Sequence, residues 1–572
     1  RFTTSFALAF SDDGCSGICM KPRGEIVVVA GLAALILLVF YPVLGADFIY
    51  FDDDVYVFEN PAVLAGLAPE SLPYAFTRSV SAHWHPLTML SYMVDVELYG
   101  KGPAGFHFTN LLLHTVNTVI LFFLLRTMTG AMWRSAFVAA IFAIHPLHVE
   151  PVAWISSRKD LLSTMFWLLA IAAYVRHARA PSPGRLALVA LAYSAGMLSK
   201  SIVVTLPFLL MLLDYWPLNR FSLENFRVIA GRKRVAMLAL EKLVLLPVGI
   251  VVLLVNAAAQ SEAGQVNADV ESSVLGLSAN ALAALASYVY AAVVPMNLAL
   301  YYPIPAGGHT GGAAGIGAFL LVGIAAIATA SLRRYPHVTV GICWFVGTLV
   351  PVIGLVQLGG QSHADRYMYF PMIGLLLAAI WGFNRESPKR TYRRFLSAFA
   401  IGAVAILSLI AAQQVRLWRD SESIFTHALG VTDNNYLIHY NLARFLESKD
   451  RYSEAAEQYL AALEIVPGHP QSHNNLGAIL AISGDLPGAI GHFEQAVRGM
   501  GSDPVVLCNL ATALADSGRH TEANEYLERA RAVAPDLPRV KRTEQALAEA
   551  TAALRQAQGE RVSGAKDVNE QE

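Results

Sequence analysis

The 572-residue sequence is poor in charged residues and in cysteine. Asp, Glu, Lys and Arg make up 15 % of it and hydrophobic residues 55 %, whereas soluble domains carry about 25 % charged residues. Much of the chain must therefore lie in a medium of low dielectric constant. The formal net charge of -1 gives no electrostatic reason to expect a nucleic acid as a partner. Four cysteines are too few for a disulfide framework, so we expect ordinary thiols.

The start of the sequence has the layout of a membrane anchor. Met20 is followed by Lys21 and Arg23 and then by an apolar run. This is the order of a start site, a positively charged region and a signal anchor. We expect residues 1–19 to be an extension without a structural role, and the first span to be retained in the bundle.

Long apolar runs over residues 20–412 predict a bundle of eleven membrane spans, since a helix needs about 20 apolar residues to cross a bilayer. The spans are expected near 25–45, 108–125, 135–150, 161–175, 187–199, 202–219, 243–257, 313–331, 338–355, 369–384 and 396–412. Lys and Arg cluster on one side of these runs, which places the N-terminus in the cytoplasm. Residues 278–294 are apolar too, but a crossing there would put Arg333 outside, so we expect a helix at the outer surface. This count puts residues 413–572 outside the cytoplasm.

The C-terminal part repeats itself every 34 residues. Residues of one kind recur at this interval: Asn441, Asn475 and Asn509; Ala455, Ala489 and Ala523; Ala462, Ala496 and Ala530. Small residues at this period, at positions where two helices cross closely, are typical of the tetratricopeptide (TPR) helix pair, with Gly484 and Gly518 at turns. We expect an array over 413–540, with a half repeat at 418–435 and repeats near 436–469, 470–503 and 504–538, and then a capping helix and a disordered tail in 541–572. Because the half repeat follows the last span directly, no flexible linker is expected. Such arrays bind extended peptides or other proteins, and a purely structural spacer is the alternative.

Polar residues gather in the predicted outer loops, where charged residues beside a span are expensive and indicate function. The first cluster is Asp52-Asp53-Asp54, in which three adjacent carboxylates repel one another. A general base, a metal site and a solvated turn are the three interpretations. The other candidate residues are His85, His145, His148, Glu150, Arg158, Asp160, Lys200, Asp365, Arg366 and Tyr367.

These clusters favour transfer from a phosphate-linked donor over a metal site. His145, His148 and Glu150 lack the spacing of a metalloprotease helix, and Pro146 disturbs the helical register between them. A carboxylate, several histidines and a few basic groups on one face are what such a transfer requires. For each single histidine, a structural hydrogen bond is the alternative interpretation.

Six short stretches of the sequence resemble those of a known family. They are YFDDDVYVFENP, HWHPLTMLSYMVD, GFHFTNLLLH, HPLHVEPVAWISSRKDLLS, LSKSIVVTLPF and ADRYMYFP. In this order, and with a TPR array after the last span, they resemble the transmembrane-and-TPR protein O-mannosyltransferases and their bacterial relatives. The resemblance implies an all-α protein, in which a polytopic bundle of the type C glycosyltransferase fold precedes an α-solenoid of TPR repeats.

The resemblance also implies an activity and its residues. The activity is inverting, metal-independent transfer of a mannose-like sugar from a polyprenyl-phosphate carrier to an acceptor hydroxyl, such as a protein Ser or Thr. The family's acidic pair matches Asp52 and Asp53, with the first as general base, and its basic residues match Arg366 and Lys200. Arg158 is a further candidate for binding the donor phosphate.

The expected partners and location combine this resemblance with the orientation of the spans. The lipid-linked sugar is a substrate, and no cofactor is expected. The expected partners are the lipid bilayer, the polyprenyl-phosphate sugar, and a polypeptide acceptor or envelope protein bound by the array. The protein is expected in the inner (plasma) membrane as a multi-pass protein, with the array on the periplasmic side.

Two other functions fit parts of the pattern. In the first, the membrane part is a catalytically dead anchor, and the array organises an envelope complex as a scaffold. An anchor does not need Asp52, Lys200 and Arg366 together, which favours an enzyme. In the second, the chain is a ligase whose donor is a diphosphate-linked glycan. The identity of the donor would distinguish this ligase from a transferase that uses a monosaccharide carrier. A transporter is disfavoured because the spans show no inverted-repeat pattern.

Overall fold

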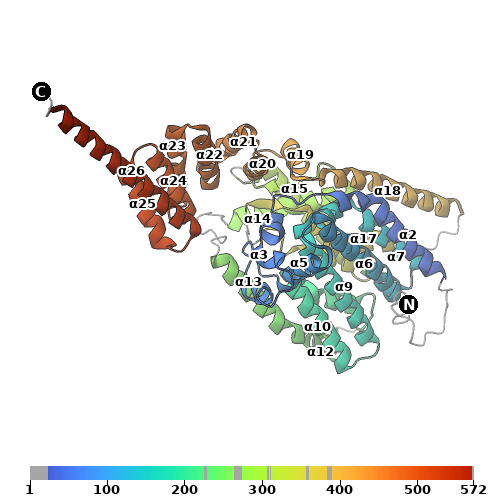
Figure 1. Ribbon diagram of the computed structural model, residues 1–572. Coiled ribbons are helices and arrows are strands. Elements are labelled where there is room, and N and C mark those ends of the chain that lie inside the picture. Colours follow the sequence, from blue (N-terminus) through green and yellow to red (C-terminus); the bar gives the residue numbers. More distant parts are fainter. Residues whose placement is uncertain are drawn as a thin grey trace.

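The computed structural model describes residues 23–224, 228–262, 274–305, 308–309, 311–355, 360–382 and 390–569. These residues form a helical bundle and an array of helix pairs that leads away from it (Figure 1). The only strands among them are β1 (Tyr302–Pro303) and β2 (Gln361–His363), which pair antiparallel. The predicted all-α class is therefore confirmed. The predicted extension 1–19, with Cys15 and Cys19, lies outside the described residues.

The bundle consists of long helices joined by short helical turns. Its α-helices are α2 (Arg23–Phe40), α3 (Pro61–Leu64), α4 (Leu72–Thr77), α5 (Pro86–Tyr99), α6 (Pro103–Thr129), α7 (Met132–Ile144), α8 (Val149–Ala153), α9 (Arg158–Arg179), α10 (Pro183–Ser199), α11 (Leu206–Tyr215), α12 (Ile229–Lys242), α13 (Leu246–Glu262), α14 (Val274–Val293), α15 (Gly311–Ser331), α16 (Pro336–Leu349), α17 (Pro371–Gly382) and α18 (Arg390–Leu417). The turns are η1 (Tyr41–Gly45), η2 (Asp54–Phe58), η3 (Pro146–His148), η4 (Ile155–Ser157), η5 (Ser201–Thr205), η7 (Leu243–Leu245) and η8 (Asp365–Met368).

The described residues include seven helices long and apolar enough to cross a membrane, or eight if the bent pair of α7 and α8 counts as one span. The seven are Gly24–Gly45, Pro103–Thr129, Ile155–Arg179, Ile229–Ser261, Val274–Val293, Gly311–Ser331 and Arg394–Leu417. The chain is thus a multi-pass membrane protein. Several predicted spans are shorter apolar helices, such as Pro336–Leu349 and Pro371–Gly382. Because α14 has the length and composition of a span, the count of eleven and the surface position of 278–294 stay predictions.

The bend between α7 and α8 positions the central part of the site. The two helices meet at 60°, at Pro146, which has no N–H to donate and cannot continue α7 beyond Ile144. The broken stretch that follows, η3 and α8, packs against η8. Residues more than 200 positions apart in the chain, such as Glu150 and Arg366, are brought together in this way.

A close helix crossing fixes η8 from its other side. Helices α16 and α17 cross at Gly341 and Gly374, where a Cβ on either residue would collide with the backbone carbonyl of the other. Small residues allow this approach, as is common between membrane helices. Because α17 follows η8 directly, the crossing holds the segment that carries Arg366.

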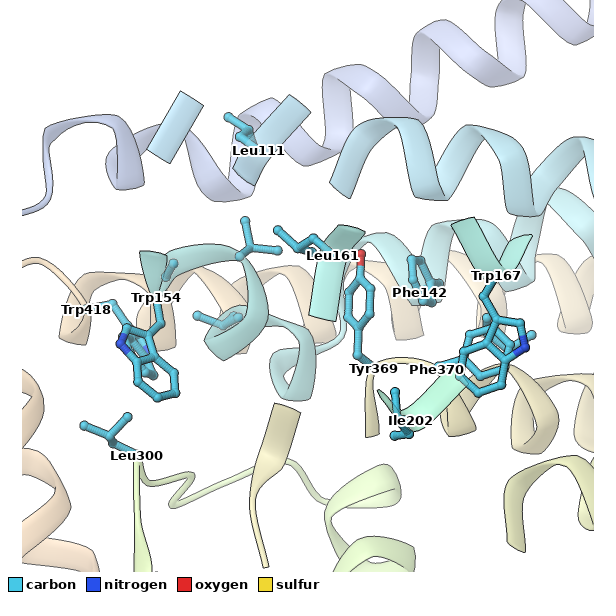
Figure 2. Packing of buried hydrophobic residues seen from close by; sticks show 14 of the residues in the cluster. Leu111, Phe142, Trp154, Leu161, Trp167, Ile202, Leu300, Tyr369, Phe370 and Trp418 are labelled. Atoms are coloured by element: carbon cyan, nitrogen blue, oxygen red, sulfur yellow. The ribbon is translucent and has the colours of Figure 1, made fainter. Parts of the chain in front are cut away.

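Buried aromatic side chains form the centre of the bundle (Figure 2). Trp167 stacks on Phe370 with ring centroids 3.5 Å apart, and Trp154 lies 6.3 Å from Trp418 at the start of the array. One apolar cluster extends from α2 through the bundle to Ile479 in α22. The array is therefore packed on the bundle, and the prediction that no flexible linker separates them is confirmed.

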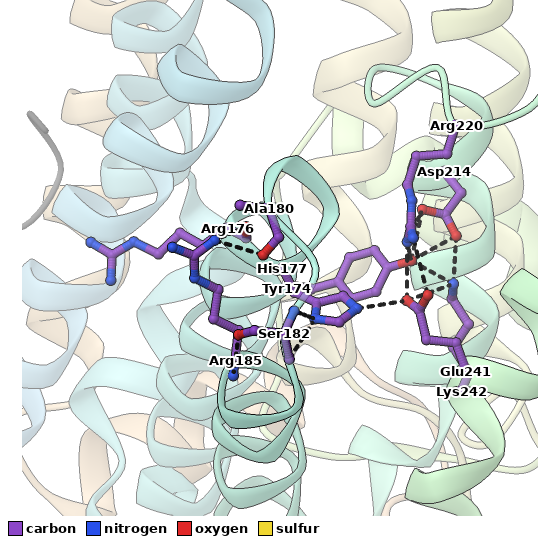
Figure 3. A network of polar contacts seen from close by, with 10 residues as sticks. All are labelled: Tyr174, Arg176, His177, Ala180, Ser182, Arg185, Asp214, Arg220, Glu241 and Lys242. Carbon is purple, nitrogen blue, oxygen red and sulfur yellow. Dashed lines mark hydrogen bonds and ion pairs between the residues drawn. The ribbon is translucent and has the colours of Figure 1, made fainter. Parts of the chain in front are cut away.

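A network of charged side chains joins three helices near the C-terminal end of α9 (Figure 3). Asp214 of α11 is fully buried and accepts hydrogen bonds from Tyr174 at 2.7 Å and Lys242 at 2.5 Å. Arg220 pairs with Glu241 at 3.0 Å. Each of these charged residues has a partner of opposite sign, so the network holds α9, α11 and α12 together.

The array follows the predicted period. Its helices are α19 (Ser421–Val431), α20 (Tyr436–Ser448), α21 (Tyr452–Ile465), α22 (Pro470–Ser483), α23 (Leu486–Gly499), α24 (Pro504–Asp516), α25 (His520–Val533) and α26 (Pro538–Asn569). The alanines predicted at helix crossings, Ala455, Ala489 and Ala523, are fully buried. Gly484 and Gly518 have positive φ angles of 90° and 82° at the turns, where a residue with a Cβ is disfavoured.

The last helix corrects one prediction. Helix α26 runs from Pro538 to Asn569, so it covers nearly all of 541–572, where we expected a capping helix and then a disordered tail. The preceding residues, 538–557, are rich in Ala, Glu, Gln and Arg, which favour a helix, and because extending a helix costs less than starting one, it continues into the tail. Residues 570–572 lie outside the described residues.

Candidate active site

The loop after the first span presents one carboxylate and buries two. Asp52 is partly exposed, whereas Asp53 and Asp54 are buried, with 0 % and 1 % of their surface exposed. Asp52 has a φ of 69°, a left-handed conformation that costs a non-glycine residue roughly 1–2 kcal/mol. Among the described residues its carboxylate has no hydrogen-bond partner. Of the three carboxylates, that of Asp52 is therefore the one left without a partner among the described residues.

Asp53 anchors the loop to the bundle. Its Oδ2 accepts a hydrogen bond from the Ile49 N–H at 2.9 Å. Its Oδ1 accepts two from Ser156, from the N–H at 2.8 Å and from the Oγ–H at 2.5 Å. Burial raises the pKa of Asp53 to about 7, although these bonds act in the opposite direction. The contacts give Asp53 a structural role, while a catalytic role for it stays a prediction.

Asp54 is bound by the array. Its Oδ2 accepts a hydrogen bond from Nη2 of Arg444 in α20 at 2.9 Å. This contact joins residues 390 positions apart, and no local sequence signal indicates it. Because the two side chains touch, the loop after the first span and the TPR-like array lie on the same side of the membrane.

Two cationic side chains from distant parts of the chain lie near enough to Asp52 to act on its charge. Burial raises the pKa of Asp52 and the nearby Asp54 charge adds to this, while Lys159 and Arg366 act in the opposite direction. Both cations are thus within interaction distance of the carboxylate. They come from the start of α9 and from η8.

Arg366 is oriented by several contacts. Its Nη1 lies 2.5 Å from Oε1 of Glu150, and its backbone N–H donates to Oε2 of the same residue at 2.8 Å. Its Nη2 donates to Oε1 of Gln361 at 3.2 Å, and the guanidinium lies 5.2 Å from the ring centre of Trp154. The structure therefore brings together Glu150 and Arg366, two of the residues predicted from the sequence.

Lys200 and Tyr367 lie beside the same group. The Lys200 Nζ is 2.6 Å from Oδ1 of Asp160, whose Oδ2 has no hydrogen-bond partner among the described residues. The Tyr367 ring centre lies 5.4 Å from the Lys200 Nζ and 5.1 Å from the Arg366 guanidinium. The Tyr367 ring thus lies within cation–π distance of both cations and stabilises them.

Lys159 is the site residue that sequence reasoning missed. Only 8 % of its surface is exposed, and its Nζ lies 4.5 Å from the ring centre of Tyr56. Among the described residues it has no anionic partner within ion-pair distance, unlike Lys200 and Arg366. Successive residues of a helix point in directions about 100° apart. The sequence alone therefore could not show which of Arg158, Lys159 and Asp160 lies near Asp52.

Arg158 belongs to a separate, fully buried network. Its Nη1 lies 2.5 Å from Oδ2 of Asp95, and its Nε donates to Oδ1 of Asn110 at 2.8 Å. Its Nη2 donates to the Phe106 carbonyl at 2.7 Å. These contacts fix α9 against α5 and α6, and they occupy the guanidinium predicted to bind the donor phosphate. The structure does not bring Arg158 to Asp52.

His85 lies at the site, stacked on His83 with ring centroids 5.4 Å apart. Burial lowers the pKa of His85 well below its usual value, and the nearby His83, Lys159 and Lys200 lower it further. The imidazole is therefore neutral at pH 7. Its Nδ1 is buried without a hydrogen-bond partner among the described residues.

The remaining candidates make structural contacts. His145 and His148 donate to the carbonyls of Ala292 and Phe142 at 3.3 Å and 2.6 Å. Asp365 accepts from the Tyr302 hydroxyl at 3.1 Å on both carboxylate oxygens. These bonds agree with the structural interpretation of the two histidines and tie η8 to β1.

Two matches to known protein families fall in the array. Models described as tetratricopeptide repeat match residues 436–469 and 480–549. The array is built of TPR repeats. This agrees with the 34-residue period and with the buried alanines at the helix crossings.

Most of the chain, bundle and TPR array together, is similar to protein O-mannosyl-transferases. It is 26 % identical over 475 residues to one from Caenorhabditis elegans, over 79 % of this chain and 65 % of the relative. It is 24 % identical over 522 residues to TMTC1 of Homo sapiens, over 81 % of this chain and 57 % of the relative. A stretch of 187 residues is 32 % identical to Tmtc2 of Drosophila melanogaster, over 30 % of this chain and 20 % of the relative. The chain spans less than two thirds of the length of these relatives.

Two solved structures of low sequence identity can also be aligned with most of this chain. ArnT from Cupriavidus metallidurans bound to undecaprenyl phosphate has a TM-score of 0.37 at 14 % identity, over 80 % of each chain. An oligosaccharyltransferase from Archaeoglobus fulgidus with a tethered acceptor peptide has a TM-score of 0.40 at 15 % identity, over 76 % of this chain and 59 % of that one.

Proposed function

We propose that this chain is a membrane glycosyltransferase that moves a mannose-like sugar from a polyprenyl-phosphate carrier to a Ser or Thr hydroxyl of a polypeptide. Its similarity to protein O-mannosyl-transferases supports the reaction class. The observation that carries the proposal is the free Asp52 carboxylate beside Lys159, a buried cation without an anionic partner among the described residues. A hydroxyl acceptor needs such a base, and a phosphate leaving group needs such a cation.

Asp52 activates the acceptor. A Ser or Thr hydroxyl is a weak nucleophile, and Asp52 accepts its proton as the oxygen attacks C1 of the sugar. Burial favours the neutral acid, whereas Lys159 and Arg366 favour the carboxylate. The two cations thus keep the base ionised in a partly dry site.

The cations stabilise the leaving phosphate. The bond between C1 and the phosphate oxygen breaks, its electron pair stays on that oxygen, and the carrier phosphate gains negative charge. Lys159 binds this charge, while Arg366 and Lys200 add positive potential from positions fixed by Glu150 and Asp160. One displacement inverts C1, and a phosphate leaves without a general acid or a metal ion.

The reaction takes place at the outer surface of the inner membrane. The prenyl tail of the carrier lies among the spans, and the sugar reaches Asp52 in the loop after the first span. The N-terminus is cytoplasmic, and the TPR array is on the outer side, where it binds the acceptor polypeptide or an envelope partner.

The test is sugar transfer from a radiolabelled polyprenyl-phosphate monosaccharide in membranes that contain the full chain. Wild type transfers sugar, and Asp52→Asn and Arg366→Ala lose transfer while remaining folded and inserted. Asp516→Asn is the matched control, because Asp516 is exposed in the array far from the loop. Full activity of Asp52→Asn rules out this residue as the base. No transfer by the folded, inserted wild type contradicts the proposal and favours a scaffold.

A further inference from the structure

Helix α20 of the array contacts the loop that carries the proposed base. Arg444 bonds Asp54 at 2.9 Å, and the next residue, Phe445, packs edge-on against Tyr50 with ring centroids 5.7 Å apart. The Tyr50 N–H donates to Oγ of Ser421, the first residue of α19, at 2.9 Å. The array therefore holds this loop on both sides of the free carboxylate.

The same helix also contacts the segment that leads to Arg366. Asn435 caps α20 by accepting the Ile438 N–H at 3.3 Å, and its amide donates to the Tyr301 carbonyl at 3.1 Å. Tyr301 precedes β1, and β1 pairs with β2, which leads into η8 and Arg366. One helix of the array thus touches both backbone segments that supply opposite charges to the site.

The Asp54–Arg444 ion pair lies where its loss has a large effect. The Asp54 side chain is 2 % exposed, and its Oδ1 has no hydrogen-bond partner among the described residues, so Arg444 supplies its main compensation. A buried charge that loses its partner is costly, and the loop would move to relieve it. The neighbouring Asp52 has a φ of 69°, a conformation that persists only when its surroundings hold it.

We infer that Arg444 is a positioning residue for Asp52, acting through Asp54. The role of Asp52 in this inference rests on the proposed function. The first complete TPR helix pair is then part of the transferase site, because it holds the loop in the conformation in which the base reaches the acceptor hydroxyl. The array has this role in addition to any binding of the acceptor polypeptide.

The experiment uses the full chain in membranes and compares a set of variants. Arg444→Gln lowers kcat on the order of 10- to 100-fold, since a displacement of about 1 Å at a catalytic group has an effect of this size. The donor KM stays close to wild type, because Arg444 does not contact the cations of the site. Arg444→Lys restores most of the activity, since an ammonium group can pair with Asp54.

A double variant and a control separate positioning from general damage. Adding Asp54→Asn to Arg444→Gln recovers part of the lost activity, because no unpaired buried charge remains. Arg519→Gln is the matched control, since Arg519 forms an exposed ion pair with Glu522 in the array. A loss of activity in Arg519→Gln as large as in Arg444→Gln overturns the inference, as does a donor KM effect without a change in kcat.

A second readout does not need transfer activity. Hydrogen exchange of the backbone amides over residues 47–60 is faster in Arg444→Gln than in wild type, and unchanged in Arg444→Lys and Arg519→Gln. If wild type transfers no sugar but this difference is found, the proposed function fails while the hold of the array on the loop stands. Wild-type exchange in Arg444→Gln overturns the inference, whether or not the chain transfers sugar.

Discussion

Glu150 and Arg366 form a two-point contact across the site. Oε1 of Glu150 lies 2.5 Å from Nη1 of Arg366, and Oε2 accepts the backbone N–H of Arg366 at 2.8 Å. The same carboxylate therefore orients both the guanidinium and the first turn of η8. The two residues are 216 positions apart, and they meet where the chain bends at Pro146, between α7 and α8.

The first prediction concerns this contact. Glu150→Gln leaves the buried Arg366 charge without its anion and lowers stability by about 3–5 kcal/mol. Thermal unfolding of the purified protein in detergent measures the loss. Glu457→Gln, at an exposed position of the array, is the control and stays within about 0.5 kcal/mol of wild type. Equal stability of the two variants would contradict a structural role for the pair.

The second prediction separates two adjacent basic residues. Lys159→Gln raises the donor KM roughly 10- to 100-fold, because a hydrogen bond to a charged group contributes about 1.5–3 kcal/mol. Arg158→Gln instead destabilises the protein, since Asp95 is left buried without its partner. Donor titration and thermal unfolding of both variants check the assignment. A normal donor KM in Lys159→Gln would remove Lys159 from the phosphate site.

The third prediction is a pH dependence. Transfer needs Asp52 ionised, and burial raises the pKa of this carboxyl above its ordinary value. The rate therefore falls as the pH falls through this raised pKa. Because Lys159 lowers the pKa of Asp52, Lys159→Gln moves the acid limb of kcat/KM to higher pH. Lys541→Gln, an exposed control in the array, leaves the limb in place, and a shift to lower pH in Lys159→Gln is the contrary result.

The fourth prediction concerns membrane topology. Arg444 bonds Asp54, so the loop after the first span and the array lie on one side of the membrane. Single cysteines at Val55 and Glu457, both exposed, are introduced into a chain without its native cysteines. A membrane-impermeant thiol reagent labels both from the same side of sealed vesicles, and on the proposed orientation this is the outer side. Labelling from opposite sides would show that the contact does not form.

Local sequence patterns predicted much of the fold. The 34-residue period identified Ala455, Ala489 and Ala523 as buried crossing points, because a repeated helix pair packs in the same way each time. Proline and glycine indicated the break at Pro146 and the turn at Gly484 for similarly local reasons. The tail was assigned wrongly because the helix that starts at Pro538 in an Ala-rich stretch continues into it, since extending a helix costs less than starting one.

The candidate site was predictable only in part. The motifs indicated Asp52, Arg366 and Lys200, which the structure places in or beside one charged group. Lys159 was not identified, because an apolar helix pattern does not show which of three adjacent charged residues lies near Asp52. Arg444 gave no signal at all, since its partner is 390 residues away.

By itself, the sequence determined the membrane bundle, the TPR array and the residue types of the site, since these follow from composition, period and motifs within short stretches. Only the tertiary structure decided the separate roles of Asp52, Asp53 and Asp54. Their side chains are chemically identical, and what differs is the hydrogen-bond partner that each one has within the described part of the chain: none for the first, Ser156 for the second and Arg444 for the third. Those partners come from distant parts of the chain, and the energy of a buried charge depends on what surrounds it in space.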